Sequence, residues 1–374
     1  MSLIDDVNAY ETWMRGQCAV VEADLDKKHR LMASDVFPFF RATCFRFART
    51  VETLAPTLKD APATPCVGDA HIENFGTWRD AEGRLVWGVN DFDEAAILPY
   101  TYDLLRLAVS VRLAPGLPGT NTERTAAILK GYQAGLTAPA ARFVDDGTEW
   151  MRTMVGAPAS LEKAFRGRLN ALTDDQPPPS LAGALRGFLP EGTGDIRIGG
   201  RQSGAGSLGR PRFVAFGVWR GDTVARETKA MLPSAWSWAT GTRWSPDLLT
   251  TLALGTHRAP DPFLKAAEGF VFRRLAADSA KLELTPSLAR TSEPALLAAM
   301  GADLAAVHVG NGFDPKTIGR DLGARAGDWL YNAAKIAAAA VQTDFETWRA
   351  YVQDQDQRQQ PARKAGQTKK TPRP

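Results

Sequence analysis

The chain of 374 residues has little of what builds a disulfide or zinc framework, with three cysteines and four histidines. Cys18, Cys44 and Cys66 are widely spaced and form no CxxC pair, so we expect reduced thiols. No apolar run approaches the roughly 20 residues that a membrane-spanning helix needs. Asp5 and Asp6 stand near the N-terminus, where a signal peptide would carry bases. These absences predict a cytoplasmic protein without a membrane span.

The charge balance gives no reason to expect nucleic-acid binding. Hydrophobic residues make up 44% of the chain and charged residues 23%, which is ordinary for a globular protein with a sizeable core. The formal net charge is +3, but residues 357–374 carry six Lys and Arg and no acid, so removing them leaves −3. The rest of the chain therefore lacks the basic character of a nucleic-acid-binding protein. The segment 357–374, rich in Gln, Lys and Pro, is predicted to be a disordered basic tail.

The hydrophobic pattern divides the chain into helical and strand-rich parts. Apolar spacing predicts helices over 102–113 and 123–136, and again over 295–309 and 329–351. Between them, three short segments rich in β-branched and aromatic residues predict an antiparallel meander. The predicted strands are residues 196–198, 213–219 and 223–231. The expected domains are residues 1–175, part of a helical lobe with a catalytic and metal-binding hairpin; 195–270, a strand-rich nucleotide lobe; and 271–355, which completes the helical lobe.

Polar side chains are concentrated between Gly68 and Glu94, among Phe, Val, Ile and Trp. Such groups are costly to bury unless each has a partner, a metal or a substrate. Two short strands around a turn at residues 80–83 predict a hairpin, which brings Asn74 to within about two positions of Asp91 on the opposite strand. A carboxylate and an amide that face one point suit a divalent cation.

These residue types fit phosphoryl transfer. That reaction uses an aspartate to orient or deprotonate the acceptor, and an asparagine and aspartates to hold Mg²⁺. Asp69 is the candidate catalytic residue, and Asn74, Asp91 and Asp93 are the candidate metal ligands. A set of turn and cap residues is the simpler interpretation, but it accounts poorly for this spacing of acids and amide. His71 is interpreted as a hydrogen-bonded loop residue rather than as a metal ligand.

A second motif, Gly204-x-Gly206-x-x-Gly209 with Ser207 inside it, matches GxGxxG. A strand rather than a helix is predicted after it, which argues against a Rossmann fingerprint. A glycine loop between antiparallel strands covers the ATP phosphates in protein kinases, whose phosphate-binding lysine lies on the third strand, as Lys229 does here. A flexible hairpin and an exposed lysine would be the simpler interpretation. Together with the acidic hairpin, the motif favours nucleotide binding by Gly204, Gly206, Ser207, Gly209 and Lys229.

The segments 68–74, 90–95 and 102–104 resemble the catalytic and metal-binding region of aminoglycoside and choline phosphotransferases. Over roughly residues 31–357 the chain is also similar to a bacterial family, domain of unknown function 2252, through its GDxHxENFG and NDFDE motifs. The kinase-like resemblance implies ATP and Mg²⁺ as cofactors. It also implies a catalytic base at Asp69, metal ligands at Asn74 and Asp91, and a nucleotide-phosphate contact at Lys229.

The resemblance implies an α+β, protein-kinase-like two-lobed fold, with a small antiparallel sheet lobe and a larger helical lobe. In ordinary kinases the glycine loop and lysine precede the catalytic loop, whereas here they follow it, so we expect a circular permutation. The glutamate that would pair with Lys229 is not identified. Glu227 lies two residues away on the same strand face, and Glu268 is only a candidate. Asp103, near the start of a helix, is interpreted as a cap or dipole partner, and His308 as a structural helix residue.

The expected function is ATP- and Mg²⁺-dependent phosphotransfer to an unidentified acceptor, with no membrane or specific nucleic acid as partner. Two alternatives stay open. One is a metal-dependent phosphohydrolase that uses Asp69, His71, Asp91 and Asp93 as ligands. The other is a nucleotide-binding pseudokinase that acts as a scaffold. This alternative stays open because no glutamate partner of Lys229 is identified.

Overall fold

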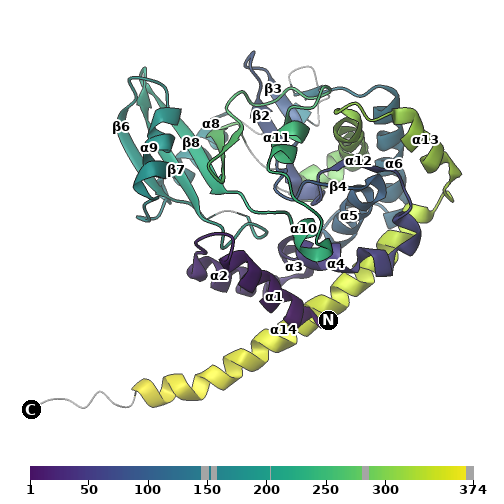
Figure 1. Cartoon of the computed structure of the whole chain (residues 1–374), viewed down its shortest axis with the longest axis horizontal. Helices are drawn as coiled ribbons and strands as arrows, with labels where there is room; N and C mark the ends of the chain where they lie inside the picture. Colours follow the sequence, from purple (N-terminus) through teal and green to yellow (C-terminus); the bar gives the residue numbers. More distant parts are fainter. Residues whose placement is uncertain (145–150, 153–157, 203, 280–285, 368–374) are drawn as a thin grey trace, which may run out of the picture.

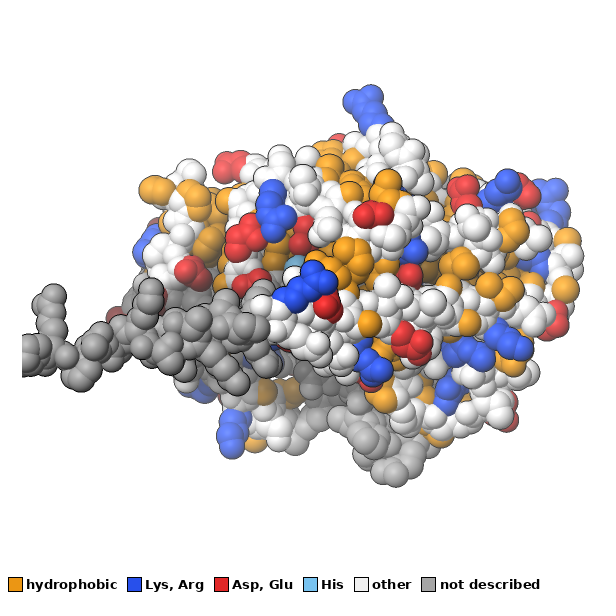
Figure 2. Space-filling model, turned by 90° about the horizontal axis from the view of Figure 1, so that it is seen from below, with side chains coloured by type: hydrophobic (Ala, Val, Ile, Leu, Met, Phe, Trp, Pro, Cys, Tyr) orange, Lys and Arg blue, Asp and Glu red, His pale blue; other side chains and the backbone are white. Residues whose placement is uncertain are grey.

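A computed structural model describes residues 1–144, 151–152, 158–202, 204–279 and 286–367 (Figure 1). The chain is α+β, with small antiparallel sheets and many helices. In Figure 1 a twisted sheet lies on one side, the main helical part lies on the other, and the N-terminal helices run below both. Within the described residues, no helix is both long and apolar enough to cross a membrane. Figure 2 shows acidic and basic side chains interspersed over one face.

The first 58 residues form helices, two of which start at a side-chain cap. Ser2 and Asp5 form a reciprocal capping box at the first helix, and the Asp35 side chain accepts a hydrogen bond from the Phe37 N–H at the third. The aromatic segment 37–47 is largely buried, as expected of core helices. These helices are α1 (Leu3–Arg15), α2 (Glu22–Ser34), α3 (Val36–Ala42), α4 (Cys44–Leu54) and η1 (Pro56–Leu58).

Two antiparallel ladders then place the acidic motifs side by side. Strands β1 and β4 pair at Cys66 and Ala96, and β2 and β3 pair at Phe75 and Val89, which confirms the predicted hairpin. The connections between the ladders, residues 67–74 (the first acidic loop) and 90–95 (the second acidic loop), therefore leave from the same end. The elements are β1 (Ala63–Cys66), η2 (Ile72–Asn74), β2 (Phe75–Arg79), β3 (Leu85–Val89), β4 (Ala96–Pro99) and β5 (Arg142–Phe143), which adds to β3.

The two acidic loops approach so closely that one position must be glycine. Gly68 has a φ of +79°, and a Cβ built there would lie 1.9 Å from the Glu94 carbonyl oxygen. The left-handed conformation and the backbone contact each disfavour any side chain. Gly68 therefore fixes the distance between the two loops.

The main core lies between long helices around these ladders. Helices α6 and α12 cross closely at Gly131 and Gly301, where a Cβ would meet the opposing backbone at 1.9 and 2.1 Å. All four helices predicted from apolar spacing are confirmed. The last one continues to Gln367, and residues 368–374 of the predicted tail lie outside the described residues. The helices are α5 (Tyr100–Leu113), α6 (Asn121–Thr137), α12 (Pro286–Val309), α13 (Pro315–Ala324) and α14 (Trp329–Gln367).

The other part is a five-stranded antiparallel sheet in the order β6-β7-β8-β10-β9, with helices on both faces. Successive residues of β7 point to opposite faces: Val214 packs with α8, and Ala215 packs with α9. The predicted meander is confirmed as β6–β8, whereas β9 and β10 were missed. The elements are α8 (Pro158–Asn170), α9 (Pro179–Phe188), β6 (Gly194–Gly200), β7 (Arg212–Trp219), β8 (Asp222–Ala230), α10 (Ala235–Thr240), α11 (Asp247–Ala253), β9 (Lys265–Ala267) and β10 (Phe270–Leu275).

Candidate functional site

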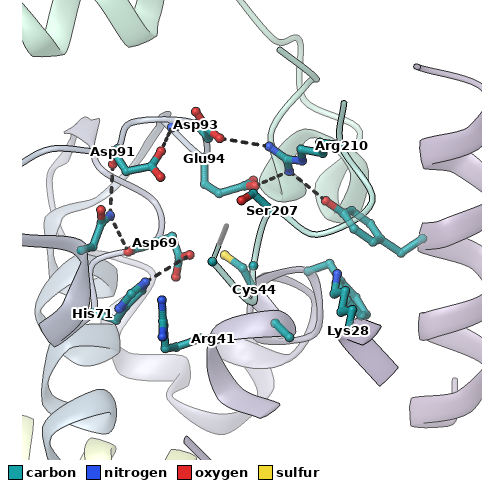
Figure 3. Close-up of a pocket in the computed structure, with 16 residues that line it drawn as sticks. Lys28, Arg41, Cys44, Asp69, His71, Asp91, Asp93, Glu94, Ser207 and Arg210 are labelled. Carbon is teal, nitrogen blue, oxygen red and sulfur yellow. Dashed lines mark hydrogen bonds and ion pairs between the residues drawn. The ribbon is translucent and has the colours of Figure 1, made fainter. Parts of the chain in front are cut away.

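A small cavity lies where the two acidic loops meet helices α1–α4 and the glycine loop, the β6–β7 connection that contains Gly204, Gly206, Ser207 and Gly209 (Figure 3). Segments distant in sequence thus form one site. The predicted residues that line the cavity are Asp69, Asn74, Asp91, Asp93, Gly204, Gly206 and Ser207. Gly209 lies at the end of the loop against Leu25, and Lys229 lines a smaller neighbouring cavity that shares Asp91 and Asp93.

Asp69 is held by a buried arginine that the sequence did not reveal. Its Oδ1 accepts a hydrogen bond from Arg106 Nε on α5, and its Oδ2 lies 3.9 Å from His71 Nε2. Arg106 is fully buried, stacks over the Phe40 ring at 4.2 Å and donates to the Phe40 carbonyl. One oxygen of the candidate base is therefore fixed by the core, while the other lies beside His71.

Asn74 ties the two acidic loops together and leaves one oxygen without a partner. Its Nδ2 donates to the carbonyls of Asp69 and Asp91, both at 3.0 Å, which fixes the orientation of the amide. Its Oδ1 is buried and has no hydrogen-bond partner among the described residues. Buried acceptors are normally satisfied, and an amide oxygen is a suitable ligand for a hard cation such as Mg²⁺. The donor set therefore fits the predicted metal.

Lys229 reaches from β8 to both aspartates of the second acidic loop. Its Nζ lies 3.4 Å from Asp91 Oδ1 and also pairs with Asp93 Oδ2. Burial and the neighbouring Asp91 carboxylate raise the pKa of Asp93, and Lys229 opposes this shift. The partners of the lysine are thus aspartates rather than a glutamate.

Both glutamates considered as partners of the lysine lie in other environments. Glu268 is exposed in the β9–β10 turn, with a φ of +53°. Glu227 is buried and pairs with Arg201, with Arg212 at 2.7 Å and with Arg273 at 2.6 Å. Burial alone would raise the pKa of Glu227, but the three guanidinium groups outweigh it and hold that pKa well below the ordinary value.

Arg210 joins the glycine loop to the second acidic loop, and sequence reasoning missed it. Its guanidinium lies 2.6 Å from Glu94 and 3.3 Å from Asp93, and it also donates to the Tyr10 hydroxyl at 3.3 Å. Burial opposes its charge, but these acids raise the pKa of Arg210 well above the ordinary value. A buried glutamate requires a cation as its partner. Glu94, among the hydrophobic residues of its motif, was therefore the sequence signal for a basic partner elsewhere in the chain.

Asp103 lies in the first turn of α5, as a dipole partner would, but it supports the first acidic loop instead of capping its own helix, which corrects the cap interpretation. Its carboxylate accepts from the backbone N–H groups of Val67 at 2.7 Å and Gly68 at 2.9 Å. His308 Nε2 lies 3.0 Å from the same carboxylate, and His308 Nδ1 bonds the Tyr132 hydroxyl at 2.8 Å. His308 is structural, as predicted.

This network bears on the hydrolase alternative. Among the described residues, one group of three His, Cys, Asp or Glu donors has all its ligand atoms within 4.8 Å of one another, namely Cys66, Asp103 and His308. Its polar atoms already contact protein partners, including Thr64 for the thiol. The donors that a hydrolase would use do not form such a group; they are Asp69, His71, Asp91 and Asp93.

The cavity is narrow in this conformation. Its volume is about 50 Å³, enough for a few water molecules, whereas sites that hold small organic ligands span roughly 300–1,000 Å³. Cys44 also lines the cavity, but burial raises the pKa of its thiol well above the ordinary value, so it is not an activated nucleophile. A nucleotide would require the glycine loop to move away from the acidic loops.

Comparison with known proteins finds one family that part of the chain matches. No curated protein and no solved structure matches the chain. Residues 19–166, which contain α2–α4 and both acidic loops but not the glycine loop, match a family described as "Uncharacterized protein conserved in bacteria (DUF2252)". This match supports the family that the GDxHxENFG and NDFDE motifs indicated.

Proposed function

We propose that the chain is a cytoplasmic, ATP- and Mg²⁺-dependent phosphotransferase with a circularly permuted, kinase-like arrangement. The observation that carries the proposal is the meeting of two distant segments at one point. Lys229 and the glycine loop come from the sheet, and they contact the loops that hold Asp69, Asn74 and Asp91. An ATP site of this kind requires that convergence.

Each side chain has a role in the proposed reaction. Asp69 would orient and deprotonate the acceptor hydroxyl, with its direction set by Arg106. Asn74 Oδ1 and the carboxylates of Asp91 and Asp93 would hold Mg²⁺, which neutralises charge on the transferring phosphoryl group. Lys229 and the N–H groups of the glycine loop would contact the nucleotide phosphates.

A nucleotide-binding scaffold is the second candidate, and one contact favours it. The carboxylate of Asp69 already bonds the buried Arg106, which reduces its availability as a base. The hydrolase alternative has less support, because no three of its four ligands have donor atoms within 4.8 Å of one another. The two remaining candidates share a nucleotide site and differ in turnover.

Thermal shifts with ATP, ADP and GTP, each with and without Mg²⁺, test the nucleotide site. We expect a Mg²⁺-dependent ATP shift in the wild type that is lost in Asp91→Ala and in Lys229→Ala. Asp222→Ala is the matched control, because Asp222 is an exposed aspartate at the start of β8, away from the cavity. No Mg²⁺-dependent ATP shift in the wild type, or a shift that survives both substitutions, refutes the site. A metal shift that needs no nucleotide and survives Lys229→Ala supports the hydrolase.

Turnover then separates enzyme from scaffold. Release of ADP from ATP by the wild type, lost in Asp69→Asn while nucleotide binding is kept, supports phosphotransfer, with water as a slow acceptor. Equal, negligible ADP release by the wild type and Asp69→Asn supports the scaffold.

A further inference from the structure

One wall of the cavity has no role in the chemistry proposed above. It is formed by α1–α4 and faces the acidic loops, with Tyr10, Lys28, Arg41 and Phe45 as its main side chains. In Figure 3, Arg41 and Lys28 lie along the lower edge of the cavity, whereas Asp91, Asp93 and Arg210 lie along the upper edge. The lower wall is therefore placed to contact the second substrate.

Lys28 is a buried cation without a counterion in contact. Its side chain is 2% exposed, and its Nζ lies 5.9 Å from the ring centroids of both Tyr10 and Phe45. Among the described residues, this ammonium group makes no hydrogen bond or ion pair, and Lys28 lines the cavity. The nearby acid on α1, Glu11, is bonded to His29 at 2.7 Å.

A buried ammonium group of this kind is costly to the fold. Burial lowers the pKa of Lys28 to about 8, even though Glu11 acts in the opposite direction. Unpaired buried charges destabilise proteins, so a lysine that lines a cavity in this state is suited to an anion from outside.

Arg41 adds a second donor on the same wall. Its Nη1 pairs with Glu73, but its buried Nε has no partner among the described residues. The acids on the opposite wall are already paired internally: Asp93 with Lys229, and Glu94 with Arg210. Among the described residues that line the cavity, the N–H donors without a protein partner are thus Lys28 Nζ and Arg41 Nε, which lie on the α1–α4 wall.

We propose that Lys28 binds an anionic group of the second substrate, so that the acceptor is a small anion with a carboxylate, phosphate or sulfate group. The inference rests on the proposed function for the identity of this ligand as the acceptor, whereas the anion site itself does not. The cavity volume of about 50 Å³ limits the part of the ligand held here to a few heavy atoms.

Calorimetric titration at pH 7 with inorganic phosphate, sulfate and malonate tests the site in the absence of nucleotide. The three arms show which anion class binds. Lys28→Met removes the charge but keeps an apolar side chain of similar length. Lys27→Met is the matched control, because Lys27 is on the same helix and its ammonium donates to Gln202 at 2.9 Å. We expect Kd for the preferred anion to rise about tenfold or more in Lys28→Met and to stay within about twofold in Lys27→Met.

Three results would overturn the proposal. In the first, none of the three anions binds the wild type at millimolar concentration. In the second, Lys28→Met binds as well as the wild type. In the third, binding is lost in Lys229→Ala but kept in Lys28→Met, which would place the ion at the nucleotide site. Unfolding curves of Lys28→Met show whether a loss of binding reflects a loss of fold.

The anion site and the nucleotide site can fail separately. Anion binding that depends on Lys28, with no MgATP shift, supports the anion site and refutes phosphotransfer. A MgATP shift without anion binding refutes the anion site alone.

Discussion

Replacing Lys28 by methionine is expected to stabilise the protein at neutral pH. Burial lowers the pKa of Lys28 from 10.5 to about 8 in the folded chain. Below pH 8 the group is charged in both states, and the folded state is penalised. A shift of this size corresponds to about 3 kcal/mol of unfolding free energy.

The sign of the pH dependence follows from proton binding. Between about pH 8 and pH 10.5 the Lys28 side chain is protonated in the unfolded chain but largely deprotonated in the folded chain. The free energy of unfolding of the wild type therefore rises as the pH rises through this window. Lys28→Met lacks this titrating group, so its free energy of unfolding does not show this rise. The stability advantage of the variant should therefore shrink by about 3 kcal/mol between pH 8 and pH 10.5.

Urea unfolding at several pH values between 7 and 10.5, followed by tryptophan fluorescence, measures this difference. Other charged and titratable groups face Lys28, namely Glu11, Glu94, Arg210 and Cys44, so the difference between variant and wild type is the quantity to follow. Lys27→Met should show no comparable trend. A variant that is less stable than the wild type by the same amount at every pH would show that the ammonium is solvated or paired, and would refute the reasoning.

Three further predictions concern other parts of the site. Gly68→Ala should lower the free energy of unfolding, measured by chemical denaturation, by roughly 3 kcal/mol or more, because the new Cβ would meet the Glu94 carbonyl. Gly83→Ala is the control: Gly83 has a φ of +77° but lies in open space, so the cost should be only about 1–2 kcal/mol, and equal costs would contradict the close contact. Glu227→Gln should destabilise by about 3–5 kcal/mol at pH 7, because it leaves three arginines near an uncharged amide, and a cost below about 1 kcal/mol would show that the cluster is solvated. Arg210→Gln should speed hydrogen exchange in the glycine loop but not in β10; unchanged exchange in both would show that the ion pairs do not hold the loop.

The hairpin and its loops were predictable because their information is local. The turn at residues 80–83 sets the register of β2 and β3, and the register places Asn74 opposite Asn90 and next to Asp91. The meander followed in the same way from alternating strands. The β9 and β10 strands were missed because they follow a helical segment, α11, although Gly269 in their turn is a hairpin signal.

The surroundings of Lys28, Arg106 and Arg210 come from distant segments and were not predictable from one sequence. Lys28 stands in an amphipathic helix among charged neighbours, where an exposed lysine is the ordinary expectation, and only tertiary packing of Tyr10 and Phe45 over it makes it buried. Arg106 and Arg210 likewise look like ordinary basic residues until the fold places Asp69 and Glu94 beside them. Spacing along the chain gives the type of chemistry, whereas the counterion of each group depends on the fold.

The charged side chains that form ion pairs across the cavity include those that Mg²⁺ and a nucleotide would contact. Lys229 and Arg210 come from the sheet side, and in this conformation they satisfy Asp91, Asp93 and Glu94 on the acidic loop. Under the proposed function, Mg²⁺ would take over Asp91 and Asp93 and the phosphates would take over Lys229, while Arg210 keeps Glu94, so none of these charges is left unpaired. The exchange limits the cost of opening a buried polar site, since breaking one partner of a buried pair alone costs about 3–5 kcal/mol. Metal and nucleotide should therefore bind together more tightly than either binds alone, and independent binding of the two would contradict this exchange.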